Sequence, residues 1–98
     1  MTERFEQACP LCQKSATYAE FDFGHRKALD CQSCGQYVIT RTAERMLSAP
    51  PGEREQQLST FVKSAPDTMI AEIRTENQPN GGKGITAEIL SRASMRLP

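Results

Sequence analysis

The stretch that decides the fold is CPLCQKSATYAEFDFGHRKALDCQSCGQYVIT, residues 9–40. It begins with the pair Cys9 and Cys12, and eighteen residues separate Cys12 from a second pair, Cys31 and Cys34. Two C-x-x-C pairs at this separation match the spacing of four-thiolate zinc sites, because each pair forms a turn that directs two sulfurs at one tetrahedral ion. The spacing predicts one Zn²⁺ ion bound by Cys9, Cys12, Cys31 and Cys34.

Other roles for the four cysteines are weighed against this prediction. Iron is the alternative metal, because a tetrahedral site of four sulfurs accepts zinc or iron. Two disulfides would need an oxidising compartment, whereas the chain starts with the charged stretch TERFEQ (residues 2–7) and not with an apolar leader. A redox dithiol would need a βαβ context. We therefore expect a metal-binding protein of the cytoplasm.

The residues around the cysteine pairs have the pattern of short strands. Residues 16–23 alternate in polarity and predict a half-buried strand. Gly24-His25 is a turn candidate, after which Arg26–Asp30 returns toward Cys31. Residues Tyr37–Thr40 are β-branched or aromatic and predict a third strand.

From about Glu6 to Thr40 the chain resembles the zinc-ribbon family, on the basis of CPLC, CQSCG and the strand-rich stretch between them. The resemblance implies a three-stranded antiparallel ribbon with the four cysteines as ligands of a structural ion. It also implies loops that contact protein or nucleic acid. Rubredoxins share the two cysteine turns but usually carry Gly after both, whereas Gln13 follows the first pair here.

The second half of the chain resembles no family, and its apolar spacing predicts helices. Four are expected, at residues 43–48, 53–63, 65–76 and 86–94, with one kinked helix over residues 53–76 as an alternative. The predicted fold class is a small α+β domain, an N-terminal three-stranded zinc ribbon followed by three or four short helices. Residues 1–41 form the ribbon, and residues 42–98 form a helical segment packed on it as one compact unit.

The charge balance argues against a nucleic-acid-coating polycation. Twelve Lys and Arg offset twelve Asp and Glu, with six of each sign in residues 1–49 and six in residues 50–98. A Zn²⁺ ion on four thiolates adds a net charge of −2. Candidate nucleic-acid contacts are basic residues near the predicted hairpin: Lys14, Arg26, Lys27 and Arg41.

These features predict a non-enzymatic zinc protein that acts as an interaction or adaptor module. Four thiolates close a tetrahedral site and leave no position for a reactive water, and no catalytic constellation accompanies them. The expected partner is an unidentified protein. The alternative function is a nucleic-acid-binding or transcription-associated ribbon. Self-association through the C-terminal helices is possible, and no apolar run is long enough to span a membrane.

Overall fold

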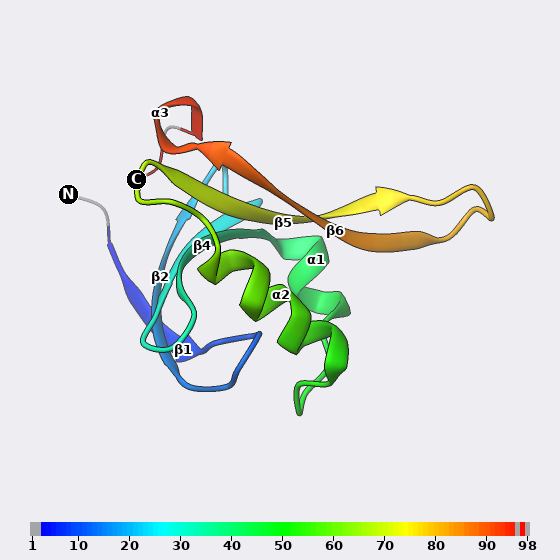
Figure 1. Ribbon diagram of the computed structural model, residues 1–98, viewed down its shortest axis with the longest axis horizontal. Helices are drawn as coiled ribbons and strands as arrows, with labels where there is room; N and C mark the ends of the chain where they lie inside the picture. Colours follow the sequence, from blue (N-terminus) through cyan, green and yellow to red (C-terminus); the bar gives the residue numbers. More distant parts are fainter. Residues whose placement is uncertain (1–2, 96, 98) are drawn as a thin grey trace.

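One six-stranded sheet runs through the chain in the computed structural model, which describes residues 3–95 and residue 97 (Figure 1). The strands are hydrogen-bonded in sequence order, β1-β2-β3-β4-β5-β6. Every neighbouring pair is antiparallel except β4 and β5, which are parallel. The elements in chain order are β1 (Phe5–Ala8), β2 (Ser15–Phe21), β3 (Arg26–Cys31), β4 (Gly35–Thr40), α1 (Arg41–Met46), α2 (Glu53–Lys63), β5 (Met69–Asn77), β6 (Lys83–Ser91) and α3 (Arg92–Met95).

The strands predicted around the cysteine pairs form as β2, β3 and β4, but the first of them ends at Phe21, because Asp22 and Phe23 lie in the turn with left-handed φ values. The β2–β3 register places Ala16 opposite Cys31, and the β3–β4 register places Cys31 opposite Gly35. The second cysteine turn therefore joins two paired strands. A strand that the sequence analysis did not include, β1, pairs with β2 and precedes the first cysteine turn.

The predicted fold class, a three-stranded ribbon followed by short helices, is wrong, because the second half of the chain adds two strands to one six-stranded sheet. Residues 65–76 and 86–94 were expected as helices, but β5 and β6 occupy most of these ranges, and α2 is the only described helix of seven or more residues. The kinked helix over residues 53–76 is excluded as well, because α2 ends at Lys63. Ser64 is the residue after the last turn of α2, and its N–H donates to the carbonyls of Phe61 and Val62.

The error has a physical cause in β5, which is buried from both sides. Four consecutive residues, Ile70–Ile73, are buried. This run is apolar except for Glu72, and periodicity cannot distinguish it from a buried helix, because the spacing of Ile70 and Ile73 also fits one helix face. A strand that lies between β4 and β6 and is covered on both faces shows this run instead of an alternation.

The crossover between the parallel strands β4 and β5 is made by α1 and α2, as parallel pairing requires a long connection. The Thr40 hydroxyl accepts a hydrogen bond from the Ala43 N–H and begins α1. Helix α2 has the bounds that the sequence predicted, and its apolar residues Leu58, Phe61 and Val62 face the core. Figure 1 shows both helices beneath the β4–β5 part of the sheet.

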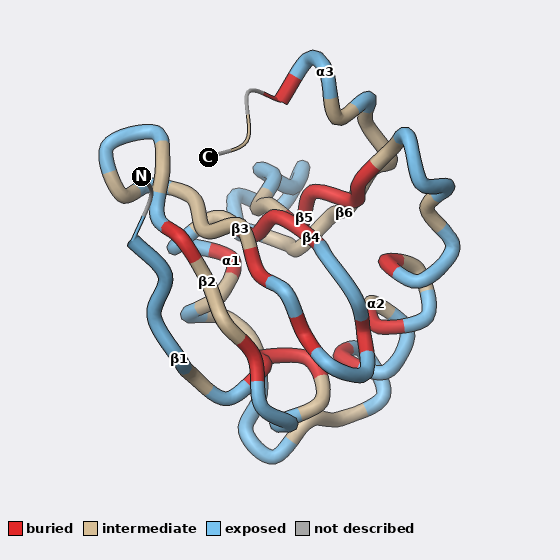
Figure 2. The backbone as a smooth tube through the Cα atoms, turned by 90° about the vertical axis from the view of Figure 1, so that its left-hand side faces the viewer, coloured by how far each residue is buried: buried red, intermediate tan, exposed pale blue. Residues whose placement is uncertain are grey.

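Apolar side chains gather on both faces of the sheet. On the helix-covered face, Val62 of α2 packs with residues of the central strands that include Leu29, Tyr37, Ile39 and Ile73. A smaller cluster lies on the other face: Val38, Ile70 and Met95, with Phe21, Leu90 and Leu97 against it. Figure 2 shows the buried residues, in red, concentrated on β2 to β5 and the cysteine turns. The cysteines lie inside the larger cluster, so the site is part of the core.

Candidate metal centre

The first cysteine turn follows β1 and turns back into β2. The Gln13 N–H donates to the Cys9 carbonyl at 2.7 Å, and the Cys9 N–H donates to the Lys14 carbonyl at 2.8 Å. Gln13 adopts a left-handed φ of 66° to close the turn. Only glycine takes this conformation without steric cost, so the turn forms at the expense of local strain.

The second cysteine turn joins β3 to β4 and has the same form. The backbone N–H groups of Ser33 and Cys34 donate to Sγ of Cys31, at 3.4 Å and 3.3 Å. Gly35 has a left-handed φ of 86° and stands at the position that Gln13 holds in the first turn. N–H groups directed at a sulfur stabilise its thiolate form, which is the form that binds metal.

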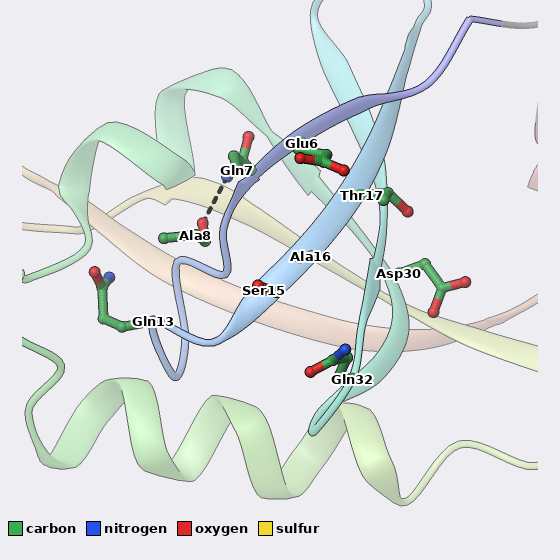
Figure 3. Close-up of a pocket in the computed structure, with 9 residues that line it drawn as sticks. All are labelled: Glu6, Gln7, Ala8, Gln13, Ser15, Ala16, Thr17, Asp30 and Gln32. Atoms are coloured by element: carbon green, nitrogen blue, oxygen red, sulfur yellow. Dashed lines mark hydrogen bonds between the residues drawn. The ribbon is translucent and has the colours of Figure 1, made fainter.

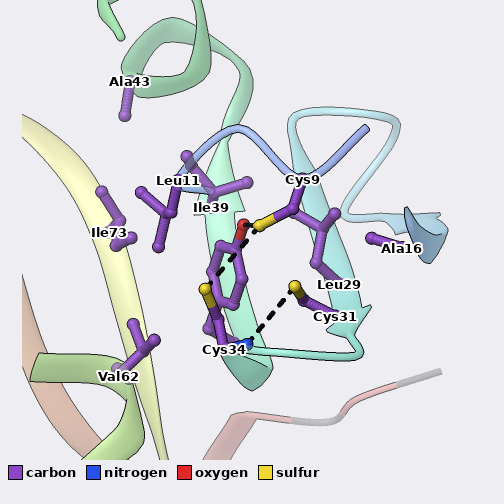
Figure 4. Close-up of a cluster of buried hydrophobic side chains, with 12 residues drawn as sticks. Cys9, Leu11, Ala16, Leu29, Cys31, Cys34, Ile39, Ala43, Val62 and Ile73 are labelled. Atoms are coloured by element: carbon purple, nitrogen blue, oxygen red, sulfur yellow. Dashed lines mark hydrogen bonds between the residues drawn. The ribbon is translucent and has the colours of Figure 1, made fainter. Parts of the chain in front are cut away.

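The two turns bring all four sulfurs together. The Sγ atoms of Cys9, Cys12, Cys31 and Cys34 all lie within 4.8 Å of one another. Sγ of Cys9 is 3.9 Å from that of Cys34, and Sγ of Cys12 is 3.4 Å from that of Cys31. The cysteines are free, which excludes the two-disulfide alternative in this structure. Figure 4 shows the sulfurs of Cys9, Cys31 and Cys34 pointing toward one another within the buried cluster.

These separations fit one tetrahedral ion. Metal–sulfur bonds of about 2.3 Å in tetrahedral geometry place neighbouring sulfurs about 3.8 Å apart. Cys9, Cys31 and Cys34 are buried and Cys12 is partly exposed. The four-cysteine cluster predicted from the sequence can therefore hold one metal ion such as Zn²⁺.

Two hydroxyl groups contact the sulfurs, and the sequence analysis missed both. The Tyr37 hydroxyl of β4 lies 3.1 Å from Sγ of Cys9, and the Ser59 hydroxyl of α2 lies 3.0 Å from Sγ of Cys34. Both residues are buried. An O–H that donates to a thiolate orients it and lowers its basicity. The tyrosine lies three residues beyond Cys34, but no spacing in the sequence relates Ser59 to the cysteines.

The surroundings affect the ionisation of the thiols in different directions. Burial raises the pKa of Cys9 from 9.0 to about 11, although the Tyr37 hydroxyl opposes the rise. Burial likewise raises the pKa of Cys34, against the Ser59 hydroxyl. Burial also acts on Cys31, but hydrogen bonds from the N–H groups of Cys34 and Ser33 outweigh it and lower the pKa of Cys31. Buried thiolates of this kind need a cation beside them.

The candidate nucleic-acid residues at the hairpin, Arg26 and Lys27, lie on opposite faces of β3. Arg26 pairs with Asp22 at 3.2 Å and with Glu72 at 2.9 Å, and its guanidinium lies over the Phe21 ring. Lys27 pairs with Glu44 at 3.0 Å. The Lys27 ammonium also lies over the Tyr18 ring, with 4.4 Å between Nζ and the ring centroid.

Of the other two candidates, Arg41 lies close to Lys27, because both line one hollow with Arg45 and Glu44. Arg41 follows β4 and pairs with Glu20 at 3.3 Å. Lys14 is exposed beside the first cysteine turn. Three of the four cations are thus matched by carboxylates, and the hollow that Lys27 and Arg41 share also contains the Glu44 carboxylate.

One pocket lies apart from the sulfurs, and no cysteine lines it. It has a volume of about 690 Å³ and is an open hollow over β1, β2 and the end of β3 (Figure 3). Its lining is polar and includes the carboxylates of Glu6 and Asp30, with Gln7, Gln13 and Gln32 around them. Both carboxylates are exposed, so the hollow provides no dry, preorganised site.

The comparisons with known proteins give no relative. No family model, no curated protein and no solved structure matches the chain. The resemblance to zinc ribbons therefore rests on the four cysteines and the strands that carry them. Among the described residues, no helix has the length and apolar character needed to cross a membrane.

Proposed function

We propose that this protein is a non-enzymatic zinc protein in which one Zn²⁺ ion, held by Cys9, Cys12, Cys31 and Cys34, serves as a structural centre of an interaction module. The observation that carries the proposal is the convergence of four free sulfurs within 4.8 Å. A bound zinc ion would cross-link separate segments of the chain. It would also neutralise the charge of thiolates whose burial in the core is otherwise unfavourable.

The composition of the site supports a structural role over a catalytic one. Four protein ligands complete a tetrahedral coordination, so no position is left for a water or a substrate. The hydroxyls of Tyr37 and Ser59 would donate hydrogen bonds to the sulfurs of Cys9 and Cys34. These contacts hold the ligands in place from β4 and from α2.

Metal analysis of the purified protein tests the zinc assignment. We expect one equivalent of zinc per chain, and less than one after Cys→Ser substitution at any of the four positions. Co²⁺ exchanged into the site should show the intense visible absorption of a tetrahedral thiolate complex. If the analysis finds one equivalent of iron instead, the bound metal is iron, because four sulfurs in tetrahedral geometry bind either metal. A fully folded protein that retains no metal would refute the proposal.

The interaction role is supported by groups that fold stability does not require. The Phe23 ring at the tip of the β2–β3 hairpin is 99% exposed. Phe23 and the preceding residue, Asp22, both have left-handed φ values, of 56° and 53°. An exposed aromatic ring on a strained turn is a local cost that a binding role explains. A partner captured by the zinc-loaded protein should be lost with Phe23→Asp and kept with Lys14→Ala.

Nucleic-acid binding stays a prediction. The ion pairs of Arg26, Lys27 and Arg41 weigh against it, because paired cations release fewer counterions from phosphates. Binding of single- and double-stranded oligonucleotides at low salt, weakening steeply as salt is added, would support it. Absence of such binding would leave the protein-interaction role.

A further inference from the structure

Strand β6 is a long edge strand, and no described strand pairs with its outer side. It is the outermost strand of the sheet and is nine residues long. It contains no proline, and its one internal charge, Glu88, pairs with Arg74 of β5 at 2.7 Å. The other edge, β1, has four residues and carries Glu6 among exposed side chains. Proteins usually shorten or charge an edge to prevent pairing, as at β1, so β6 is the exception.

The register of the β5–β6 hairpin identifies which backbone groups of β6 are free. Gln78 donates to the Gly82 carbonyl, and Arg92 donates to the Thr68 carbonyl, just beyond the two ends of the hairpin pairing. Bonded and non-bonded pairs alternate along an antiparallel ladder, so the even-numbered residues of β6 bond to β5. The odd-numbered ones turn their N–H and C=O groups outward. These are Lys83, Ile85, Ala87, Ile89 and Ser91, of which the Ser91 carbonyl also accepts a hydrogen bond from the Ser94 hydroxyl at 2.9 Å.

The outward-facing backbone groups of β6 can pair with the same groups of a second copy of the chain. When two copies of β6 run antiparallel about a two-fold axis at Ala87, all nine residues are paired and the five outward residues face one another as bonded pairs. Ile85 then lies opposite Ile89 of the second copy, and Glu88 opposite Thr86. A shift of the axis by one residue to Glu88 would oppose two carboxylates, which is unfavourable. A shift to Thr86 leaves the end of the strand unpaired.

We propose that two copies of this chain associate through β6 to form one continuous twelve-stranded sheet. The half-buried apolar side chains of Ile85, Ala87 and Ile89 extend the larger core cluster toward the edge. Pairing covers them with the same residues of the second copy. Figure 1 shows the outer half of the β5–β6 hairpin reaching beyond the helices, which leaves this edge accessible.

The molar mass of the zinc-loaded chain tests the association. Sedimentation over about 1 µM to 1 mM should move from the chain mass of 10.9 kDa toward twice that value. Ala87→Pro should give a monomer over this range, because the Ala87 N–H bonds to no strand within the chain and is central in the dimer. A monomer at every concentration of the wild-type chain would overturn the proposal.

Substitutions at exposed Ser91 test the register without touching the core. Ser91 would lie opposite Lys83 of the second copy, so Ser91→Glu adds two attractive pairs and Ser91→Lys two repulsive ones. The dimer dissociation constant should fall with Glu and rise with Lys, by about two- to thirty-fold each. Gln57 is exposed on α2, so Gln57→Glu and Gln57→Lys are matched controls and should change the dimer dissociation constant little. Equal effects at both positions, or shifts of the same sign for both Ser91 variants, would reject this register.

Hydrogen exchange offers a readout that does not depend on any variant. The amides of Ile85, Ala87 and Ile89 should become protected as concentration rises, whereas those of Thr86 and Glu88 should be protected at all concentrations. A dimer with no concentration-dependent protection at the odd-numbered residues would assign the interface to another surface and overturn the proposal.

Discussion

The Ser59 hydroxyl of α2 lies 3.0 Å from Sγ of Cys34 in the second cysteine turn, and both side chains are buried. This contact joins a helix from the second half of the chain to a site built by the first half. Together with the Tyr37 hydroxyl at Cys9, it makes the four-cysteine cluster part of the domain core.

Ser59→Ala should weaken metal binding while all four ligands remain. Loss of a hydrogen bond to a ligand costs about 10- to 100-fold in metal affinity. Competition with a chromophoric chelator measures the change. Ser64→Ala is the control, because the Ser64 hydroxyl donates only to the Phe61 carbonyl at the exposed end of the same helix. Equal affinities for the two variants would show that the Ser59 contact contributes nothing.

Metal removal should unfold the whole domain and not only residues 6–40. Cys9, Cys31 and Cys34 pack in one cluster with Val62 of α2 and Ile73 of β5, so loss of the centre opens a core that both halves share. Structural zinc supplies about 10–16 kcal/mol in small domains, more than most have as net stability. In NMR spectra, the backbone amide signals of β5 should lose their dispersion together with those of β3 as chelator is added. Persistent dispersed β5 signals would contradict this prediction.

Gln13→Gly should stabilise the protein by about 0.5–1 kcal/mol. The left-handed φ of 66° at this position has a steric cost for Gln13 that glycine does not have. The reciprocal change is Gly35→Ala, where φ is 86° and an added Cβ would meet no atom within 4 Å. That change should destabilise by about 1 kcal/mol through conformation alone. Denaturant unfolding of the zinc-loaded proteins measures both effects. The same sign for both would contradict the strain argument.

Phe23→Gly should also stabilise the protein, by about 0.5–1 kcal/mol, because the ring is 99% exposed and the backbone has a φ of 56°. The comparison variant is Phe21→Ala. Phe21 packs against the smaller cluster, so its truncation should instead destabilise by a few kcal/mol at most. Thermal unfolding distinguishes the two. A loss of stability with Phe23→Gly would mean that the turn prefers the aromatic residue.

Glu55 should make the protein acid-sensitive. Its carboxylate is buried, which acts to raise its pKa, but N–H groups of Gly52 and Ser48 and the Arg54 side chain donate to it and hold the pKa below its usual 4.5. A lowered pKa in the folded state stabilises the fold above pH 4.5, and that contribution disappears as pH falls below it.

Glu55→Gln should therefore cost about 1–3 kcal/mol at pH 7, and the difference from wild type should shrink as pH falls through 4.5. The difference between the two proteins cancels acid effects that they share, including those on the metal centre. Unfolding free energies measured from pH 7 to 4 give this difference. A gap that stays constant with pH would exclude the carboxylate as its source.

The cysteine cluster and the strands beside it were predictable because both depend on local chemistry. The two C-x-x-C turns need only a few neighbouring residues to direct their sulfurs. Alternation in β2 and the β-branched run of β4 are signals within one strand. Helix α2 carries acids at its N-terminus and an apolar stripe, and its bounds were read correctly.

The sequence by itself thus determined the four-cysteine cluster, the strands β2 to β4 beside it and α2, whereas tertiary structure decided that β5 and β6 are strands. The spacing of apolar residues from Met69 to Ile73 fits one face of a helix as well as a buried strand. It becomes a strand because β4, more than thirty residues earlier at Tyr37, offers a free edge for parallel pairing with Ala71. The same long-range packing brings Ser59 to Cys34, because contacts between distant segments leave no periodic signal in the chain.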